Sequence, residues 1–202
     1  MELPYLCGIY NDCCTYSYIS GSCIIDVQIL SNNMNENKLN IIVEEMLPTN
    51  WQSVVDIYVH GFSTRNATFQ TEAPTWEEWN KNHFEDLRFV ATINETITGW
   101  AALSPVSSRS VYSGVMEVSV YVHENYRRKG IGNALLDRLI TESETKNIWT
   151  LQSGIFPENL GSIALHEKFG FRRIGYREKV GKMDGVWRDT VLMERRSKTV
   201  GL

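Results

Sequence analysis

The region that most constrains the fold runs from residue 115 to residue 146. It opens with alternating apolar and polar residues, VMEVSVYVH (residues 115–123), a pattern typical of a strand. The basic glycine turn RRKGIG (residues 127–132) follows, and the next segment carries apolar residues at helical spacing, namely Leu135, Leu136, Leu139 and Ile140. A strand that leads through a glycine turn into an amphipathic helix predicts an α/β chain.

Further strands are expected on both sides of this region. β-branched and apolar runs predict them at residues 39–45, 88–93, 97–103, 148–152, 171–180 and 186–195. Tight turns at residues 94–96 and 184–185 would each join two neighbouring strands.

Three more helices are indicated by their N-terminal capping residues. Thr49 with Gln52 and Thr75 with Glu78 have the spacing of capping boxes, and Asn159 is a favourable N-cap. The sequence therefore predicts helices that begin near residues 50, 76 and 159. With its length of 202 residues, the chain is expected to form a single main domain.

The composition excludes several classes of protein. Apolar residues make up 43% of the chain and charged residues 22%, so neither a disordered nor a fibrous protein is expected. The net charge of −4 gives no general attraction to nucleic acid. No segment approaches the roughly 18 consecutive apolar residues of a membrane span, so we expect a soluble protein without a membrane partner.

The four cysteines are confined to the N-terminal segment: Cys7, Cys13, Cys14 and Cys23. They lack the paired spacing of a zinc site, and the N-terminus lacks the basic start of a signal peptide, so a cytoplasmic location is expected. We expect residues 1–38 to be an extension outside the core fold and residues 39–202 to be the domain. A strand over residues 23–30 that docks on the domain is the alternative.

The turn at residues 127–132 has the chemistry of a phosphate site. Free amide N–H groups at a helix N-terminus bind phosphate, Gly130 and Gly132 leave the backbone open, and three cations precede the helix. The segment lacks the Gly-Lys-Ser/Thr end of a P-loop and the third glycine of a dinucleotide fingerprint. It predicts a diphosphate site of another kind, and the alternative is an ordinary glycine turn before a solvated helix.

Several motifs in a fixed order resemble the GCN5-related N-acetyltransferase (GNAT) superfamily and, within it, the phosphinothricin N-acetyltransferase branch. The shared motifs are ATFQT at residues 67–71, EVSVYV at 117–122, the Arg-x-x-Gly-x-Gly loop at 127–132, LHE at 165–167, and the segment from Gly181-Lys182 through Trp187-Arg188-Asp189. The resemblance covers residues 39 to about 197. It implies an α/β GNAT fold, in which a mixed, mostly antiparallel sheet is splayed between two strands and carries helices on both faces.

The resemblance also implies a function. Such a chain would move the acetyl group of acetyl-CoA to the primary amine of a small amino-acid-like compound such as phosphinothricin, methionine sulfoximine or methionine sulfone. It would need no metal and would form a homodimer. Acetylation of a polyamine or a peptide amine, and a noncatalytic acyl-CoA-binding module, remain alternatives.

The residues that match the family motifs imply three cofactor-binding segments: a strand, a loop and the start of a helix. The strand would bind the pantetheine amides, the loop would hold the diphosphate, and the helix start would contact the distal pantetheine. The residues implied are Val120, Tyr121, Val122, Arg127, Arg128, Lys129, Gly130, Ile131, Gly132, Asn133, Asn159 and Ser162.

Glu117 and His166 are the candidate catalytic residues. Glu117 lies among apolar strand residues, where a buried, unpaired carboxylate is costly unless it has a function. The resemblance makes it the base that removes the proton of the acceptor ammonium; an exposed strand carboxylate is the alternative. His166 stands where many superfamily members have a tyrosine acid, so it would protonate or hydrogen-bond the leaving sulfur; a packing histidine between Leu165 and Phe169 is the alternative.

Phe69, Arg109 and Tyr112 are the candidate acceptor-binding residues. Arg109 would bind a carboxylate through two hydrogen bonds, while Phe69 and Tyr112 would line the pocket. The alternative for Arg109 is a solvated loop arginine. Residues 187–189 are expected to close this pocket, at a dimer interface.

Overall fold

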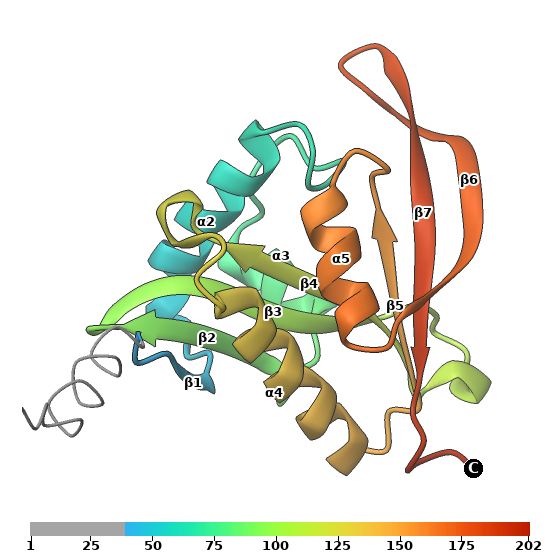
Figure 1. Cartoon of the computed structure of the whole chain (residues 1–202), viewed down its shortest axis with the longest axis horizontal. Coiled ribbons are helices and arrows are strands. Elements are labelled where there is room, and N and C mark those ends of the chain that lie inside the picture. The colour runs from blue at the N-terminus through green and yellow to red at the C-terminus, as the bar shows by residue number, and fades with distance from the viewer. Residues whose placement is uncertain (1–38) are drawn as a thin grey trace, which may run out of the picture. The chain divides into compact units, whose positions relative to one another are not determined.

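The computed structural model describes residues 39–202, and the expectations for residues 1–38 lie outside the described residues. Figure 1 shows the course of the described chain. Its elements are β1 (Ile42–Glu45), a 3-10 turn (Pro48–Asn50), α2 (Trp51–Ser63), α3 (Trp76–Asn82), β2 (Arg88–Ile93), β3 (Thr96–Pro105), a 3-10 turn (Ser110–Tyr112), β4 (Val115–Val122), a 3-10 turn (Glu124–Tyr126), α4 (Ile131–Thr145), β5 (Thr150–Ile155), α5 (Leu160–Lys168), β6 (Arg172–Met183) and β7 (Val186–Arg196).

The strands within residues 39–202 form one seven-stranded sheet in the order β1-β2-β3-β4-β5-β7-β6. Every neighbouring pair is antiparallel except β4 and β5, which run parallel. These two strands pair only from Val115 with Thr150 to Glu117 with Gln152, although β4 continues to Val122. The expected mixed, mostly antiparallel sheet that is splayed between two strands is confirmed.

Helices cover both faces of the sheet, as the family resemblance implied. On one face, α4 packs Leu139 into a core that also holds Met193 of β7. On the other face, Trp79 of α3 joins a second core around Trp100, and Tyr121 of β4 packs against it. Two layers of helices therefore enclose the sheet. Within residues 39–202, no helix is both long and apolar enough to cross a membrane.

Of the two predicted capping boxes, the one before α3 is confirmed. The Thr75 amide donates to Glu78 Oε2 at 3.0 Å, and the Glu78 amide donates to Thr75 Oγ1 at 3.2 Å. These reciprocal bonds satisfy two backbone donors that a helix start leaves without partners.

The capping box predicted at Thr49 and Gln52 is wrong. Thr49 lies inside the 3-10 turn, and the side-chain amide of Gln52 donates to Asp56 Oδ1 at 2.9 Å, within α2. Asn50, the N-cap of α2, instead accepts at Oδ1 from the Leu47 amide at 2.7 Å. The turn that begins at Pro48 shifts the helix start by one residue, so the Thr-x-x-Gln spacing is out of phase.

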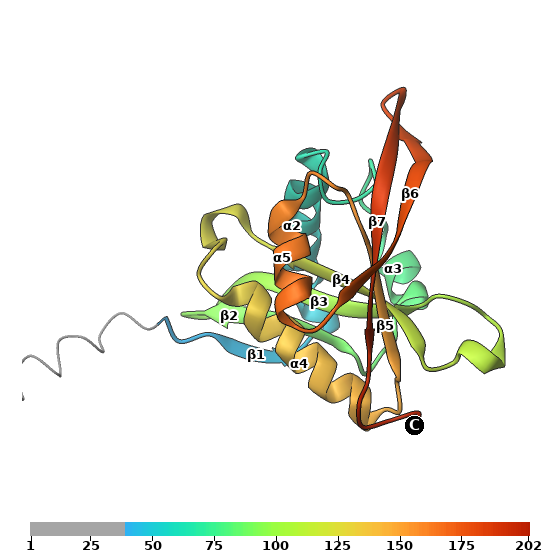
Figure 2. The same ribbon diagram turned by 45° about the vertical axis from the view of Figure 1, so that its right-hand side comes forward.

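Both predicted hairpin turns are present, although the first has two residues between its strands and not the three expected at residues 94–96. Asn94 and Glu95 have φ values of 48° and 64°, and Asp184 and Gly185 have values of 49° and 82°. Positive φ at both central residues matches the twist of paired strands. The second turn ends the long β6–β7 hairpin, which projects beyond the rest of the sheet in Figure 2.

Candidate active site

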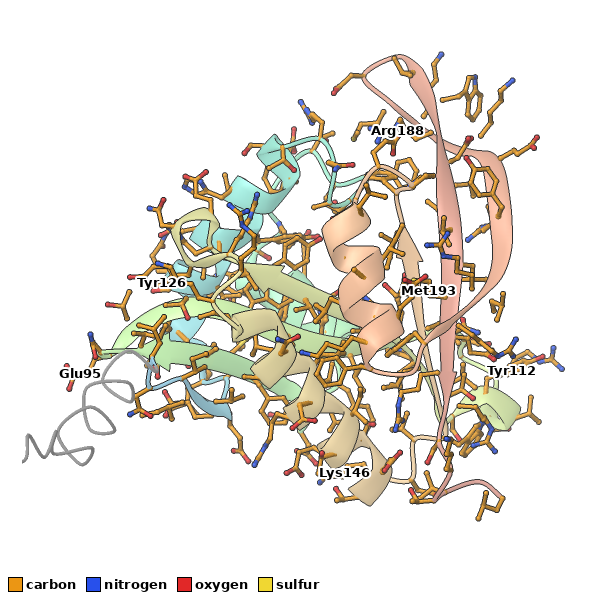
Figure 3. The ribbon with its side chains drawn as sticks, in the orientation of Figure 1. Glu95, Tyr112, Tyr126, Lys146, Arg188 and Met193 are labelled. Atoms are coloured by element: carbon orange, nitrogen blue, oxygen red, sulfur yellow. The ribbon has the colours of Figure 1, made fainter. Side chains whose placement is uncertain are left out.

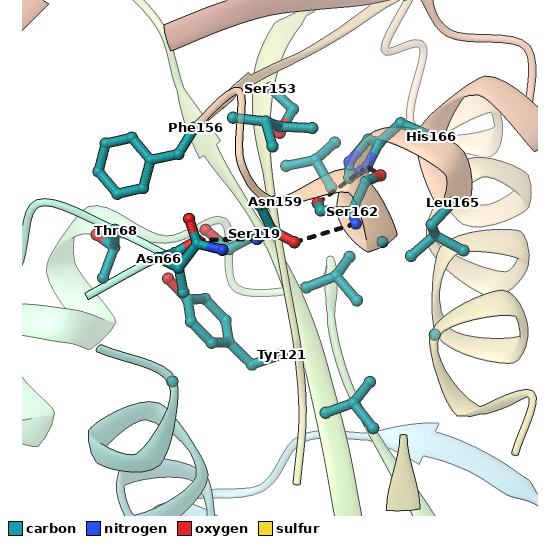
Figure 4. Close-up of a pocket in the computed structure, with 18 of the residues that line it drawn as sticks. Asn66, Thr68, Ser119, Tyr121, Ser153, Phe156, Asn159, Ser162, Leu165 and His166 are labelled. Carbon is teal, nitrogen blue, oxygen red and sulfur yellow. Dashed lines mark hydrogen bonds between the residues drawn. The ribbon is translucent and has the colours of Figure 1, made fainter. Parts of the chain in front are cut away.

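A cavity of about 820 Å³ opens where β4 and β5 diverge (Figure 4). Its lining includes Glu117 and Ser119, which project from one face of β4, and Val118 and Val120, which project from the other. The cavity therefore passes through the sheet. Its volume is within the range of small-molecule sites.

One end of the cavity is formed by the predicted phosphate loop. Gly130 is the N-cap of α4 with a φ of 92°, a left-handed conformation that favours glycine. The first amides of α4 have no acceptor within the helix, and the loop residues around them line the cavity: Arg127, Arg128, Gly130, Ile131, Gly132 and Asn133. This arrangement fits a diphosphate.

Lys129 is the one member of the predicted loop that is not on the cavity wall. Its ammonium nitrogen lies 5.0 Å from the centre of the Tyr126 ring. Arg128, with a φ of 60°, and Gly130 both take left-handed backbone conformations, and the residue between them is carried outward. The ammonium group therefore makes a cation–π contact with Tyr126 and does not face the cavity.

The splayed part of β4 offers free backbone groups. β3 pairs with β4 as far as Val122, but β5 stops pairing with β4 at Glu117. The amide and carbonyl groups of residues 118–122 that point toward β5 consequently have no strand partner. Val120, Tyr121 and Val122 all line the cavity, where an extended ligand with amide groups can complete the hydrogen-bond ladder.

Asn159 joins the start of α5 to the loop between α2 and α3 (residues 64–75). Its Oδ1 accepts from the Ser162 amide at 3.2 Å, and its Nδ2 donates to the Asn66 carbonyl oxygen at 3.0 Å (Figure 4). Asn159 and Ser162 line the cavity, as does Asn66. One side chain thus caps a helix and holds the α2–α3 loop against the cavity.

Glu117 faces the cavity at the point where the sheet opens. Its side chain is exposed there, so solvent reaches the carboxyl group. The cavity walls still raise the pKa of Glu117 by partial desolvation, and the positive charge of Arg177 opposes that rise. The result is a carboxyl group that binds a proton more readily than a freely solvated one.

His166 lies deeper in the cavity and is only 2% exposed. Its Nδ1 is 2.8 Å from the Ser162 carbonyl oxygen, which requires the proton to be on Nδ1 (Figure 4). Nε2 is buried and has no partner within residues 39–202. Burial lowers the pKa of His166, so the neutral ring holds a lone pair at Nε2. The ring also packs edge-on against Phe171, with centroids 4.9 Å apart.

Of the three predicted acceptor residues, only Phe69 lines the cavity. Its ring meets that of Phe156 edge-on, with centroids 4.8 Å apart. Arg109 and Tyr112 are not on the cavity wall; the guanidinium of Arg109 lies 5.6 Å from the Tyr112 ring. Figure 3 labels Tyr112 at the edge of the molecule, far from the cavity-lining Tyr126.

The position of Arg109 and Tyr112 follows from the topology. Their loop joins β3 to the start of β4, whereas the cavity opens beside the later part of β4. The β3–β4 connection therefore lies at the end of the strand that is still paired with β5. The structure does not bring this loop to the cavity formed by the same chain.

The predicted closing segment, residues 187–189, contacts the same end of the cavity as Phe69. The guanidinium of Arg188 lies 4.2 Å from the centre of the Phe156 ring and donates to the Arg65 carbonyl oxygen at 2.9 Å. Arg188 also pairs with Glu158 at 3.2 Å. The β6–β7 hairpin is thus attached both to the end of β5 and to the α2–α3 loop.

Sequence analysis missed several residues that line the cavity. They are Thr64, Asn66, Thr68, Gln70, Tyr126, Ser153, Phe156 and Thr190, among others. Thr68 and Gln70 lie within the ATFQT motif and Asn66 directly precedes it, so this motif could have indicated all three. Phe156 and Thr190 carry no local signal, because their place depends on how β5 and β7 pair. Among the described residues, no group of three or more His, Cys, Asp or Glu side chains is placed to hold a metal ion.

Comparison with known proteins gives concordant matches. The family model described as "Acetyltransferase (GNAT) family" matches residues 51–171, a span that includes Glu117, the loop at 127–132 and His166. A phosphinothricin N-acetyltransferase of Streptomyces coelicolor is 33% identical over 150 residues, which are 70% of this chain and 88% of that protein.

Two further proteins are similar to this chain. An L-methionine sulfoximine/L-methionine sulfone acetyltransferase of Salmonella typhimurium is 34% identical over 105 residues, which are 52% of this chain and 61% of that protein. The crystal structure of a GNAT superfamily phosphinothricin acetyltransferase from Sinorhizobium meliloti, in complex with AcCoA, superposes with a TM-score of 0.72 at 26% identity and covers 80% of this chain and 90% of that one.

Proposed function

The chain belongs to the acetyltransferase (GNAT) family and is an acetyl-CoA-dependent N-acetyltransferase; we propose that its acceptor is the primary amine of a small amino-acid-like compound. Phosphinothricin, methionine sulfoximine and methionine sulfone are the acceptors to test first. The names of the relatives from Streptomyces coelicolor and Salmonella typhimurium support this choice.

The observation that carries the proposal is the path of the cavity through the sheet. The loop at residues 127–133 and the free edge of β4 form its cofactor end, and Glu117 faces the opening from the other side of the sheet. Acetyl-CoA and an amine can therefore approach the same point from opposite faces. This geometry holds the two reactants next to each other while each occupies its own side of the sheet.

The cofactor roles follow from this arrangement. The helix amides of residues 131–133, with Arg127 and Arg128, would hold the diphosphate, and the unpaired backbone of residues 120–122 would bind the pantetheine amides. Asn159 and Ser162 would contact the distal pantetheine. Lys129 would contribute only long-range charge, because its side chain lies over Tyr126.

Acetyl-CoA supplies a thioester whose carbonyl carbon can be attacked by a free amine. Glu117 would take the proton from the arriving ammonium, directly or through one water, so that the nitrogen lone pair can form the new C–N bond. The C–S bond then breaks, the electron pair leaves on sulfur, and the nitrogen loses its second proton to the departing thiolate or to solvent. The raised pKa of Glu117 suits this step, since it brings the carboxyl closer to the amine in proton affinity.

Near neutral pH, His166 would accept a hydrogen bond at Nε2 and would not donate one to the leaving sulfur. Its Nδ1 proton is committed to Ser162, and its lowered pKa opposes a second proton on the ring near neutral pH. The general-acid role predicted for His166 would therefore require the ring to become cationic. A loss of activity on the basic side that disappears in His166→Gln would favour that acid role.

An assay of thiol release with acetyl-CoA tests the function. The panel contains phosphinothricin, methionine sulfoximine, methionine sulfone, a polyamine and a peptide with a free N-terminus, and mass spectrometry identifies the acetylated product. Turnover with the three small acceptors, lost in Glu117→Gln, is expected. Turnover only with the polyamine or the peptide would replace the proposed acceptor class.

We also propose that the protein acts as a homodimer in the cytoplasm. Apolar side chains on the β6–β7 hairpin support an interface there: Tyr176, Val186 and Trp187 are each more than half exposed. A cytoplasmic location agrees with the supply of acetyl-CoA in that compartment. Light scattering of the purified chain measures the mass in solution, and a monomeric mass would contradict the dimer.

A further inference from the structure

Arg177 on β6 is not itself on the cavity wall, but its strand partner on β7 is. In the β6–β7 pairing it is directly opposite Thr190, which is buried and lines the cavity. Residues directly opposite each other on paired strands project to the same face of a sheet. The side chain of Arg177 therefore leaves β6 on the same face as Thr190.

This face is also the one from which Glu117 projects. Glu117 pairs with Gln152 on β5, and Gln152 pairs with Glu194 on β7. Two steps of two residues along β7 lead from Glu194 to Thr190, and each such step keeps the same face. Strand register alone thus places Glu117, Thr190 and Arg177 on one face, across the opening between β4 and β5.

The charge of Arg177 is available to a ligand. Its neighbours on β6 are paired, Arg172 with Glu194 at 2.7 Å and Arg173 with Glu167 at 2.9 Å. Within residues 39–202, Arg177 has no carboxylate within 4.0 Å, and its side chain is exposed. Its field nevertheless reaches the cavity, because it lowers the pKa of Glu117 against the larger effect of desolvation.

An apolar wall borders the space on this face. Phe69 and Phe156 meet edge-on, and Phe69 lies so close to Gly181 of β6 that a Cβ atom there would come within 2.6 Å of the ring. The strand that carries Arg177 is thus packed directly against the acceptor end of the cavity. A ligand here would meet a carboxylate, an aromatic wall and a guanidinium.

We propose that Arg177 binds an anionic group of the acceptor, a carboxylate or a phosphinate, while the acceptor amine lies at Glu117. The inference rests on the proposed function and names the residue that selects a zwitterionic acceptor. A guanidinium holds such a group with two parallel hydrogen bonds, which a lysine does not reproduce. Arg177 thus takes the role that the sequence assigned to Arg109, whose loop does not reach this cavity.

Steady-state kinetics with matched acceptors test the proposal. Methionine sulfone carries one carboxylate, its carboxamide carries none, and phosphinothricin adds a phosphinate. In Arg177→Gln, kcat/KM for an acceptor that uses this contact should fall by about 10- to 100-fold, and kcat/KM for the carboxamide should change less than about threefold. Arg177→Lys should recover only part of the loss.

The controls separate this contact from general charge effects. Arg173→Gln removes the same charge from β6 on the opposite face and should leave the acceptor preference unchanged. Acetyl-CoA affinity, measured by calorimetry, should be the same in Arg177→Gln and the wild type. Arg109→Gln tests the earlier assignment directly, and a carboxylate-selective loss in that variant alone would overturn the role of Arg177.

The outcomes distinguish the inference from its premise. A loss with methionine sulfone and phosphinothricin alike identifies the α-carboxylate, and a loss with phosphinothricin alone identifies the phosphinate. Equal changes for all three acceptors, or none, overturn the inference while the function stands. If the wild-type enzyme acetylates none of the three, the proposed function fails and the inference falls with it.

Discussion

Glu117 and Gln152 form the last residue pair between β4 and β5, and the sheet opens immediately beyond them. The candidate base is therefore held by a fully paired strand segment on one side and faces the cavity on the other. A carboxylate fixed at the edge of such an opening can reach a ligand that lies in the gap without a mobile loop to carry it.

Replacing Glu117 by glutamine should separate catalysis from binding. The amide keeps the shape of the side chain but cannot accept the ammonium proton, so kcat near neutral pH should fall by about a hundredfold. The loss should shrink at high pH, where the free amine is already present in solution. Kinetics across pH give kcat and KM separately, and a raised KM with unchanged kcat would mean that Glu117 only anchors the ammonium.

The same variant should not lose stability at neutral pH. The pKa of Glu117 is raised in the folded chain, so the folded state binds this proton more tightly than the unfolded state does. Its stabilising contribution is present at low pH and is lost as the pH rises through the folded pKa. Glu117→Gln removes the cost of the desolvated charge, and its Tm at pH 7 should equal or exceed that of the wild type; a clear drop would contradict this account.

The pH profile should respond to Arg177. The guanidinium lowers the pKa of Glu117, so Arg177→Gln should raise that pKa and move the acid limb of kcat/KM to higher pH. Assaying the neutral carboxamide acceptor isolates this effect from the loss of substrate binding. Arg173→Gln, on the other face of β6, is the matched control and should leave the profile in place.

Two glycines with positive φ allow a controlled test of the phosphate loop. Gly130 has a φ of 92° at the start of α4, and Gly170 has a φ of 82° after α5, where an added Cβ atom would meet nothing within 4 Å. Each substitution by alanine should cost roughly 1 to 2 kcal/mol of backbone strain. Only Gly130→Ala should also weaken acetyl-CoA binding, measured by calorimetry. Equal affinities in both variants would remove the loop from the cofactor site.

Asn159 has two separable functions. Asn159→Asp keeps an oxygen that can cap α5 but loses the donor to the Asn66 carbonyl, whereas Asn159→Ala loses both. The alanine variant should therefore be about 1 kcal/mol less stable, while the aspartate variant should retain most of its stability. Both should raise KM values, because both lose the hydrogen bond that holds the α2–α3 loop. Unchanged KM in Asn159→Asp would show that only the cap matters.

Deletion of residues 1–33 should leave Tm and acetyl-CoA affinity nearly unchanged. Residues 39–202 contain a seven-stranded sheet and the cavity-lining residues identified above. Thermal melting and calorimetry of the shortened chain check this expectation. A large fall in either quantity would show that the N-terminal segment contributes to the domain.

The sequence by itself determined the features that depend on near neighbours in the chain. The capping box of Thr75 and Glu78, the positive-φ turn at Asp184 and Gly185, and the basic loop before α4 each involve a few consecutive residues. Strand and helix periods are local in the same way. Even the failure at Thr49 was a local one, because Pro48 moved a helix start by a single position.

Only the tertiary structure decided which side chains meet in the cavity. Arg109 precedes Glu117 closely in the chain, yet its loop lies at the paired end of β4; Arg177 is distant in the chain, yet register across β5 and β7 places it on the face of Glu117. Likewise, only the pairing that stops at Gln152 shows where the sheet opens. The physical reason is that a strand's neighbours, and the face each side chain takes, are set by hydrogen bonds between segments far apart in the chain, which no local pattern encodes.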